Sequence, residues 1–344
     1  MIKQLIKEGF ILKSKGYYKH AIEAFYKALE LDNKSPELLL EIAELYFLMG
    51  KEEHSLNYIK QILDKNPVHI GSLELLEKVF LEKGALEDAE QTAKNIYCIS
   101  RKTKDLERIF EILIQEKKYS EIFTYNTEEI SPKITFIFAL AKYQLNELAN
   151  ADELINKALE TETNQEFLLL KGQILLKKNE DAECKSLLNK IKITKSNPKV
   201  LNFAGLVEQR NGNYKKALEY FKTALTLEPQ NDEYNYNCAS TYFKMGENTL
   251  ARKFYNMAIS INPENNSYHL ALANLYYSEK LYKRAMEELY GDFYEARLLK
   301  SIILYDTGYL ALARKELLEL EKICPKDNLI TDYIGKIRKE LSLS

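Results

Sequence analysis

One pattern occurs twice between Pro198 and Asn265, and its interval constrains the fold more than any other feature of this sequence. The matching positions of the two copies are 34 residues apart. The copies read Gly212, Ala217, Phe221, Ala224 and Pro229, and then Gly246, Ala251, Tyr255, Ala258 and Pro263. Similarity at a fixed interval of this size is typical of stacked repeats, in which each unit packs only on its neighbours. The sequence therefore predicts a single array of repeats.

Each repeat reads as two helices with a turn between them. Apolar residues recur at three- and four-residue steps on both sides of a central glycine, and Gly16, Gly50 and Gly84 show the same 34-residue interval. We expect the glycine to end the first helix with positive φ. The prolines fit this register, because none falls inside a predicted helix. They open units or lie near unit ends: Pro36, Pro132 and Pro198, and Pro67, Pro229, Pro263 and Pro325.

The repeat register divides the chain into ten units and a closing helix. Residues 2–102 hold three units, 103–131 hold a degenerate fourth unit, and 132–327 hold six more. The fourth unit is short because its second helix is reduced, and we expect it to be a joint between the blocks on either side. The ninth unit breaks early, at Gly291-Asp292. Residues 328–344 are predicted to be a C-terminal capping helix and tail.

The pattern resembles the tetratricopeptide repeat. That family has a small residue at position eight, a glycine near fifteen, small residues at twenty and twenty-seven and an aromatic at twenty-four. The seventh unit supplies Gly205, Gly212, Ala217, Phe221 and Ala224, and the eighth supplies Ala239, Gly246, Ala251, Tyr255 and Ala258. The departures are Glu77 and Phe110 at the small position and Asn126 at the aromatic one. The resemblance implies an all-α, right-handed α-solenoid (superhelix) of antiparallel helical hairpins with a C-terminal capping helix.

The resemblance also implies a concave groove, lined by the first helices, that holds a partner peptide or helix. The expected groove residues are Phe136, Leu140, Tyr143, Leu169, Asn202, Leu206, Gln209, Tyr236, Phe243, Asn274, Tyr277, Leu298 and Tyr305. Apolar members would bury hydrophobic anchors of the partner, while Asn202, Gln209 and Asn274 would hold its backbone. A second interpretation stays open, in which many of these aromatics only pack on neighbouring helices. In the N-terminal units the equivalent positions are mostly acidic: Glu37, Glu44, Glu74, Lys78, Glu107 and Glu111.

No catalytic or metal-binding pattern accompanies these repeats. The four histidines are isolated, no phosphate-binding glycine loop is present, and the acidic residues stand near lysines at helical spacing. We therefore expect a non-enzymatic scaffold or adaptor for protein partners, with no cofactor and no metal. The lysine–asparagine pair with which one subclass of the family clamps a C-terminal carboxylate is missing, which disfavours a receptor for chaperone tails.

Two alternative functions remain open. Groove aromatics and the pairs Lys117-Lys118, Lys177-Lys178 and Lys215-Lys216 would suit a helical-repeat RNA-binding protein. The acidic N-terminal groove and the net charge of −2 oppose a phosphate backbone, so we expect no nucleic-acid partner. In the other alternative, a peptide-sensing regulator, a small signalling peptide fills the groove and tightens the array.

The remaining sequence features concern the compartment. No apolar run approaches the length of about 18 residues that a membrane-spanning helix needs, and the N-terminus lacks a signal-peptide core. The four cysteines are widely separated, which is typical of unpaired thiols in a reducing compartment. We therefore expect a cytoplasmic protein. The partner's identity, the oligomeric state and self-association are left open by these features.

Overall fold

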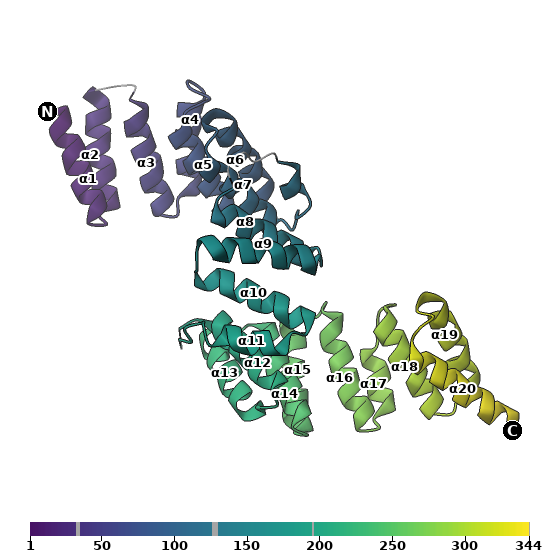
Figure 1. The fold of residues 1–344 in the computed structure, drawn as a ribbon. Helices are drawn as coiled ribbons and strands as arrows, with labels where there is room; N and C mark the ends of the chain where they lie inside the picture. Colours follow the sequence, from purple (N-terminus) through teal and green to yellow (C-terminus); the bar gives the residue numbers. More distant parts are fainter. Residues whose placement is uncertain (32–34, 126–129, 195, 344) are drawn as a thin grey trace. The chain divides into compact units, whose positions relative to one another are not determined.

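The computed structural model describes residues 1–31, 35–125, 130–194 and 196–343. These residues form twenty α-helices and one 3-10 turn and contain no strand (Figure 1). Most consecutive helices pack against each other as antiparallel hairpins, and within each of the chain's two compact units most hairpins pack on the next. The all-α hairpin array predicted from the sequence is confirmed.

The chain divides into two compact units, Met1–Ile174 and Leu175–Ser344, whose boundary falls within α10 (Gln165–Lys178). The N-terminal unit contains α1 (Ile2–Ser14), α2 (Tyr18–Leu31), α3 (Pro36–Leu48), α4 (Glu52–Leu63), α5 (Ile70–Glu82), α6 (Leu86–Ser100), α7 (Thr103–Gln115), η1 (Glu121–Thr124), α8 (Pro132–Gln144) and α9 (Leu148–Thr161). The C-terminal unit contains α11 (Asp181–Leu188), α12 (Pro198–Arg210), α13 (Tyr214–Leu227), α14 (Asp232–Lys244), α15 (Asn248–Ile261), α16 (Asn266–Ser278), α17 (Tyr282–Glu288), α18 (Tyr294–Asp306), α19 (Leu310–Ile323) and α20 (Asn328–Leu343).

Several first helices begin at the proline that opens a unit in the repeat register, namely α3 at Pro36, α8 at Pro132 and α12 at Pro198, and local capping explains several helix starts. The side chain of Asn197 accepts a hydrogen bond from the amide of Val200, and Pro198 occupies the first helical position of α12. Asn231 caps α14 in the same way by accepting from the amide of Tyr234. A capping oxygen satisfies an otherwise unpaired helical N–H, and proline has no N–H to leave unpaired there.

The chain reverses within each hairpin through one left-handed residue at the fifteenth position. Gly212 shows the favoured case, with φ of 77°. Four hairpins place a side-chain-bearing residue in this conformation, including Lys280 with φ of 59°. The full row is Gly16, Gly50, Gly84, Lys117, Asn146, Asn179, Gly212, Gly246, Lys280 and Gly308. The turn geometry is therefore kept even where the sequence departs from glycine.

The small position and the aromatic position of a hairpin are complementary in size. A methyl group on Gly205 would lie 2.4 Å from the ring of Phe221, so a glycine is required opposite this phenylalanine. In the third hairpin the buried Glu77 occupies the small position, and the residue at the aromatic position is Ala93. The two departures offset each other because the volume at the crossing is shared between the helices.

Three hairpins have a shortened second helix. In the fourth only η1 remains, and the ring of Phe110 at the small position packs edge-on against Tyr125 and tilted against Phe138. The shortening of α17 follows the predicted break at Gly291-Asp292, whereas that of α11 was not predicted. Asn126 lies outside the described residues. The boundary within α10 does not coincide with 103–131, and a joint there stays a prediction.

Helix α20 closes the C-terminal unit. Its Ile330, Ile334 and Ile337 are buried together with Leu317 and Leu320 of α19. The outer face of α20 carries exposed charged residues, including Lys336 and Glu340. This distribution is that of a cap whose outer side faces water.

Candidate functional site

A row of half-buried apolar side chains runs along the first helices of the C-terminal unit. Leu206 on α12, Tyr236 and Phe243 on α14, and Leu270 and Tyr277 on α16 rest on one buried cluster. That cluster includes Phe221, Ala239, Tyr255 and Leu272. Each side chain is therefore fixed at its base by the core while part of it stays open to solvent. We call these five residues the apolar row. Leu298 and Tyr305 of α18 are also half-buried, and they pack against a different buried cluster, which is formed by residues of α19 and α20.

The tyrosines of this region are held by specific contacts. The ring of Tyr236 stacks on that of Tyr268 with centroids 5.0 Å apart, and burial raises the pKa of Tyr236. The hydroxyl of Tyr277 donates to Asp306 Oδ2 at 2.7 Å, and burial together with this bond raises the pKa of Tyr277. The hydroxyl of Tyr305 donates to Glu340 Oε1 at 2.5 Å, which raises the pKa of Tyr305 to about 12.

Two of the three amides predicted to hold a partner's backbone bond to the neighbouring hairpin. Asn202 is buried and donates to Glu233 Oε1 at 2.9 Å. Gln209 is also buried, and its Nε2 donates to Thr241 Oγ1 at 2.7 Å. Asn274 is exposed, and its Nδ2 donates to the carbonyl of Leu270 in its own helix. The first two amides therefore bond α12 to α14, and only Asn274 is presented to solvent.

In the N-terminal unit the predicted groove residues form a shorter apolar set. Phe136, Leu140, Tyr143 and Leu169 are all half-buried. The first three pack against a buried cluster that includes Ile155 and Phe167, and the ring of Phe136 stacks on that of Phe167 with centroids 4.7 Å apart. These residues pack on neighbouring helices, as one sequence interpretation expects, and they also keep part of their surface open, as a groove would require.

The acidic side chains of the N-terminal hairpins are bridged by cations from adjacent hairpins. Lys13 reaches Glu41 at 2.6 Å and Glu44 at 2.9 Å. Similarly, Lys133 reaches Glu111 at 2.5 Å and Glu107 at 3.8 Å. Part of the negative charge predicted for this stretch is thus neutralised within the array.

A charged row, which the sequence analysis did not single out, follows the ends of the first helices in the C-terminal unit. It consists of the thirteenth residue of each successive first helix, and we call it the rim row. Its members, from α10 to α20, are Lys177, Arg210, Lys244, Ser278, Asp306 and Glu340. The row changes from three cations, through serine, to two carboxylates. The repeat register would have revealed it, because its members share one repeat position.

A hollow of about 610 Å³ opens beside the cationic part of the rim row. It lies at the turn from α12 to α13 and is lined by Gly212, Asn213, Tyr214, Lys215, Lys216 and Met245. Lys216 pairs with Glu208 at 2.6 Å, whereas Lys215 has no hydrogen bond or ion pair with any described residue. Lys244, which precedes Met245, bonds to Gln209 Oε1 at 3.2 Å. Desolvation and the neighbouring Arg210 lower the pKa of Lys244.

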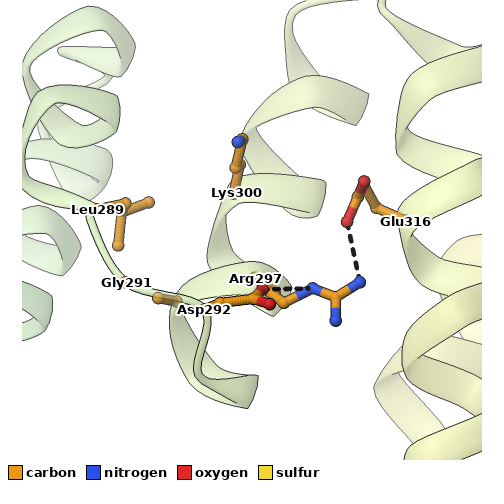
Figure 2. A pocket seen from close by; sticks show the side chains of 7 residues that line it. Leu289, Gly291, Asp292, Arg297, Lys300 and Glu316 are labelled. Carbon is orange, nitrogen blue, oxygen red and sulfur yellow. Dashed lines mark hydrogen bonds and ion pairs between the residues drawn. The ribbon is translucent and has the colours of Figure 1, made fainter.

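A second hollow, of about 260 Å³, lies where the short α17 ends (Figure 2). Figure 2 shows Arg297 between two carboxylates, Asp292 at 3.4 Å and Glu316 at 3.2 Å. Lys300 adds a second cation to the lining. Two cations therefore face two carboxylates, and this hollow has no excess charge with which to select a ligand.

Neither a metal site nor a membrane-spanning helix is present in the described part of the chain. No group of three or more histidine, cysteine or acidic side chains within it could hold a metal ion. None of the helices described above is long and apolar enough to cross a membrane. The buried thiols of Cys184 and Cys238 have a raised pKa because they are desolvated, so they are poor nucleophiles.

Comparisons with known proteins agree with this architecture. A family model described as tetratricopeptide repeat matches residues 209–275, and a second with the same description matches residues 5–35. The TPR repeat-containing protein MJ1428 of Methanocaldococcus jannaschii is 25% identical over 224 residues, which are 63% of this chain and 37% of that protein. The match thus spans little more than a third of that relative. The crystal structure of the APC/C hetero-tetramer Cut9-Hcn1 is similar with a TM-score of 0.62 and 11% identity, covering 98% of this chain and 76% of that chain. At this identity the likeness shows the fold alone.

Proposed function

Because this chain carries tetratricopeptide repeats, we propose that it is a non-enzymatic adaptor that binds a segment of a partner protein on its first helices. The observation that carries the proposal is the apolar row. Its members are rooted in a buried cluster, yet each keeps part of its surface open on α12, α14 or α16. Such a surface can bury the hydrophobic anchors of an extended or helical segment.

The rigidity of the row favours binding. Aromatic and leucine side chains that are already packed at their base lose little conformational entropy when a partner covers them. Large side chains in well-packed positions are also the residues that most often carry the binding energy of an interface. Leu206, Phe243 and Leu270 are the members to replace in a test, because Tyr236 and Tyr277 also hold neighbouring helices through a ring stack and a hydrogen bond. The buried Asn202 and Gln209 would act indirectly by keeping α12 and α14 in register.

The test compares two triple variants in an affinity-capture experiment with quantified partners. In the first, Leu206→Ala, Phe243→Ala and Leu270→Ala remove open parts of the apolar row. In the matched control, Leu227→Ala, Leu250→Ala and Met257→Ala remove three exposed apolar side chains from the second helices α13 and α15. We expect the first variant to capture at least tenfold less of one partner than the wild type does, while the control captures an unchanged amount. The helicity of both variants should be unchanged. Loss in the control alone would assign binding to the second helices instead.

RNA binding is the second candidate, and one observation favours it. The C-terminal unit combines tyrosines with an excess of lysine and arginine, a combination that can bind single strands. The affinity of such RNA binding falls steeply as the salt concentration rises. A titration of a random RNA oligomer at increasing salt tests it, and a weak, flat response would exclude this candidate.

A further inference from the structure

The two compact units carry opposite charge. Leu175–Ser344 contains 26 lysines and arginines and 22 acidic residues, whereas Met1–Ile174 contains 23 and 29. Within the C-terminal unit the rim row is itself polarised, from Lys177, Arg210 and Lys244 to Asp306 and Glu340. The row runs beside the apolar row, since Phe243 immediately precedes Lys244 and Tyr277 precedes Ser278. A segment bound to the apolar row would therefore meet a field that changes sign along its length.

At both ends of the rim row, charged side chains are hydrogen-bonded by neutral groups. Asp306 and Glu340 each accept a hydrogen bond from a groove tyrosine, Tyr277 and Tyr305 respectively. At the cationic end the single hydrogen bond of Lys244 to the described residues is with the neutral oxygen of Gln209, and Lys244 stands near a second cation, Arg210.

The cations around the nearby hollow add to the positive charge at this end of the rim row. Arg210 pairs with Asp181 at 2.9 Å, and Lys216 pairs with Glu208. Lys215 and Lys244 have no carboxylate partner among the described residues. Of these four cations only Arg210 and Lys216 pair with a carboxylate of the described residues, and a hollow of about 610 Å³ that a side chain can enter lies beside them. An anion placed there relieves repulsion between Arg210 and Lys244 and gains charge-assisted hydrogen bonds.

We propose that the C-terminal unit binds a protein segment whose carboxylate side chains lie over Arg210 and Lys244 and whose apolar side chains continue toward α16 and α18. This inference rests on the proposed adaptor function and adds the partner's chemistry and direction. The reversed direction places the segment's carboxylates against Asp306 and Glu340, where like charges repel. A nucleic acid is disfavoured because it carries a phosphate at every nucleotide and would meet the same two carboxylates.

The probe is a displayed library of random dodecapeptides, selected on the intact protein at physiological salt. We expect enriched peptides to carry aspartate or glutamate on one side of aromatic or aliphatic anchors. An enriched peptide is then synthesised with a fluorophore and titrated by anisotropy against the wild type, Lys244→Glu and Lys244→Gln. We expect about tenfold weaker binding to K244E and a smaller loss with K244Q. Replacing the peptide's acidic residues with lysine should restore binding to K244E.

The control is Lys253→Glu, an equal charge change at an exposed position of the second-layer helix α15, which should alter affinity less than twofold. Direction is read by a photo-crosslinker placed at either end of the peptide. Crosslinks from the acidic end should fall on α12 or α14, and those from the other end on α16 or α18.

The outcomes separate this inference from the adaptor function. Enriched peptides that bind the apolar row, as shown by loss with Phe243→Ala, but are neutral or insensitive to K244E would overturn the inference and leave the function. Absence of any peptide sensitive to F243A would overturn both. Tighter, K244E-sensitive binding of a uridine oligomer than of any peptide would assign the cations to phosphate and also overturn it.

Discussion

Asn237 donates a hydrogen bond from Nδ2 to Oδ1 of Asn202 at 2.8 Å, across the step from α14 to α12. Both side chains are buried, and the Asn202 side chain in turn donates a hydrogen bond to Glu233. The partners are 35 and 31 residues apart, so the bonds join equivalent faces of consecutive hairpins. A buried amide is stable only when its polar atoms are paired, and these bonds therefore fix the register of the two hairpins.

Replacing Asn202 with leucine should destabilise the C-terminal unit. The change leaves the Asn237 amide buried without its acceptor, which costs about 1–3 kcal/mol in the free energy of unfolding. Urea denaturation followed by helical circular dichroism measures the loss. Asn274→Leu is the matched control, because the Asn274 side chain is exposed and bonds only within its own helix. Its effect should stay within about 0.5 kcal/mol. Equal effects of the two variants would show that the bond across the hairpins does not stabilise the stack.

The amide side chains of Asn202 and Gln209 show which features of the structure could be predicted from the sequence and which could not. The repeat register predicted the starts of α3, α8 and α12, because small residues, turn glycines and prolines recur at fixed positions. The same register gives the charge order of the rim row without any structure. The repeat register could not show that the side chains of Asn202 and Gln209 are already hydrogen-bonded within the array. Their partners lie 31 to 35 residues away, and these bonds depend on how closely adjacent helices approach. The shortening of α11 was also missed, since Ile191 continues the apolar pattern of Leu187 and Leu188 beyond the helix end.

Replacing Arg108 with methionine should destabilise the N-terminal unit strongly. Arg108 binds both oxygens of the buried Glu77, with Nη2 at 2.6 Å from Oε2 and Nε at 3.1 Å from Oε1. Burial raises the pKa of Glu77, and Arg108 opposes that shift. Without the cation a buried carboxylate is left unpaired, at a cost of about 3 kcal/mol or more. Urea denaturation at pH 7 measures it.

The double variant Arg108→Met with Glu77→Ala separates the ion pair from the packing. Removing the carboxylate as well should recover part of the loss, because alanine is the residue type that suits this position in other hairpins. Additive losses from the two changes would contradict an ion-pair explanation.

Glycine in place of Lys280 should stabilise the ninth hairpin. Lys280 has φ of 59°, in the left-handed region that a side chain disfavours. Relief of this strain, less the greater freedom of glycine in the unfolded chain, should raise the free energy of unfolding by about 0.5–1 kcal/mol. The melting temperature is the readout. The same change at Lys253, inside α15, should instead destabilise by about 1 kcal/mol. A loss of stability in Lys280→Gly would mean that the lysine makes a stabilising contact that outweighs the strain.

Hydrogen exchange should reveal whether 103–131 forms a joint. Helix α7 is well packed, since Ile109, Phe110 and Leu113 are fully buried, but the second helix of its hairpin is reduced to the short η1. We expect slow exchange in α7 and exchange at least tenfold faster after Gln115 than in the second helix of the regular hairpin at α13. Uniform protection from Thr103 to Ser131 would contradict a joint.

The carboxylates of Glu90 and Glu116 should give stability an unusual pH dependence. Lys118 Nζ lies 2.7 Å from Glu90 Oε2 and 3.1 Å from Glu116 Oε1, and Lys94 also pairs with Glu90. Burial raises the pKa of both carboxyls, but for Glu90 the hydrogen bonds from the lysines outweigh it and lower the pKa to about 2. For Glu116 the neighbouring Glu90 adds to the effect of burial, and the pKa is raised above its ordinary value of 4.5. Its Oε2 is buried without a hydrogen-bond partner in the described structure.

The two shifts act on stability in opposite directions. A carboxyl with a raised folded pKa destabilises the fold at neutral pH, and this cost disappears as the pH falls through that pKa. Glu116→Gln should therefore raise the free energy of unfolding at pH 7, with a gain that shrinks toward pH 4.5. Glu90→Gln should lower it at pH 7, and the difference should fade progressively as the pH falls from about 4.5 toward about 2. Urea denaturation at pH 7, 5.5 and 4 distinguishes them. A loss of stability in E116Q at pH 7 would show that the lysine bridge outweighs the burial of a second carboxylate beside Glu90.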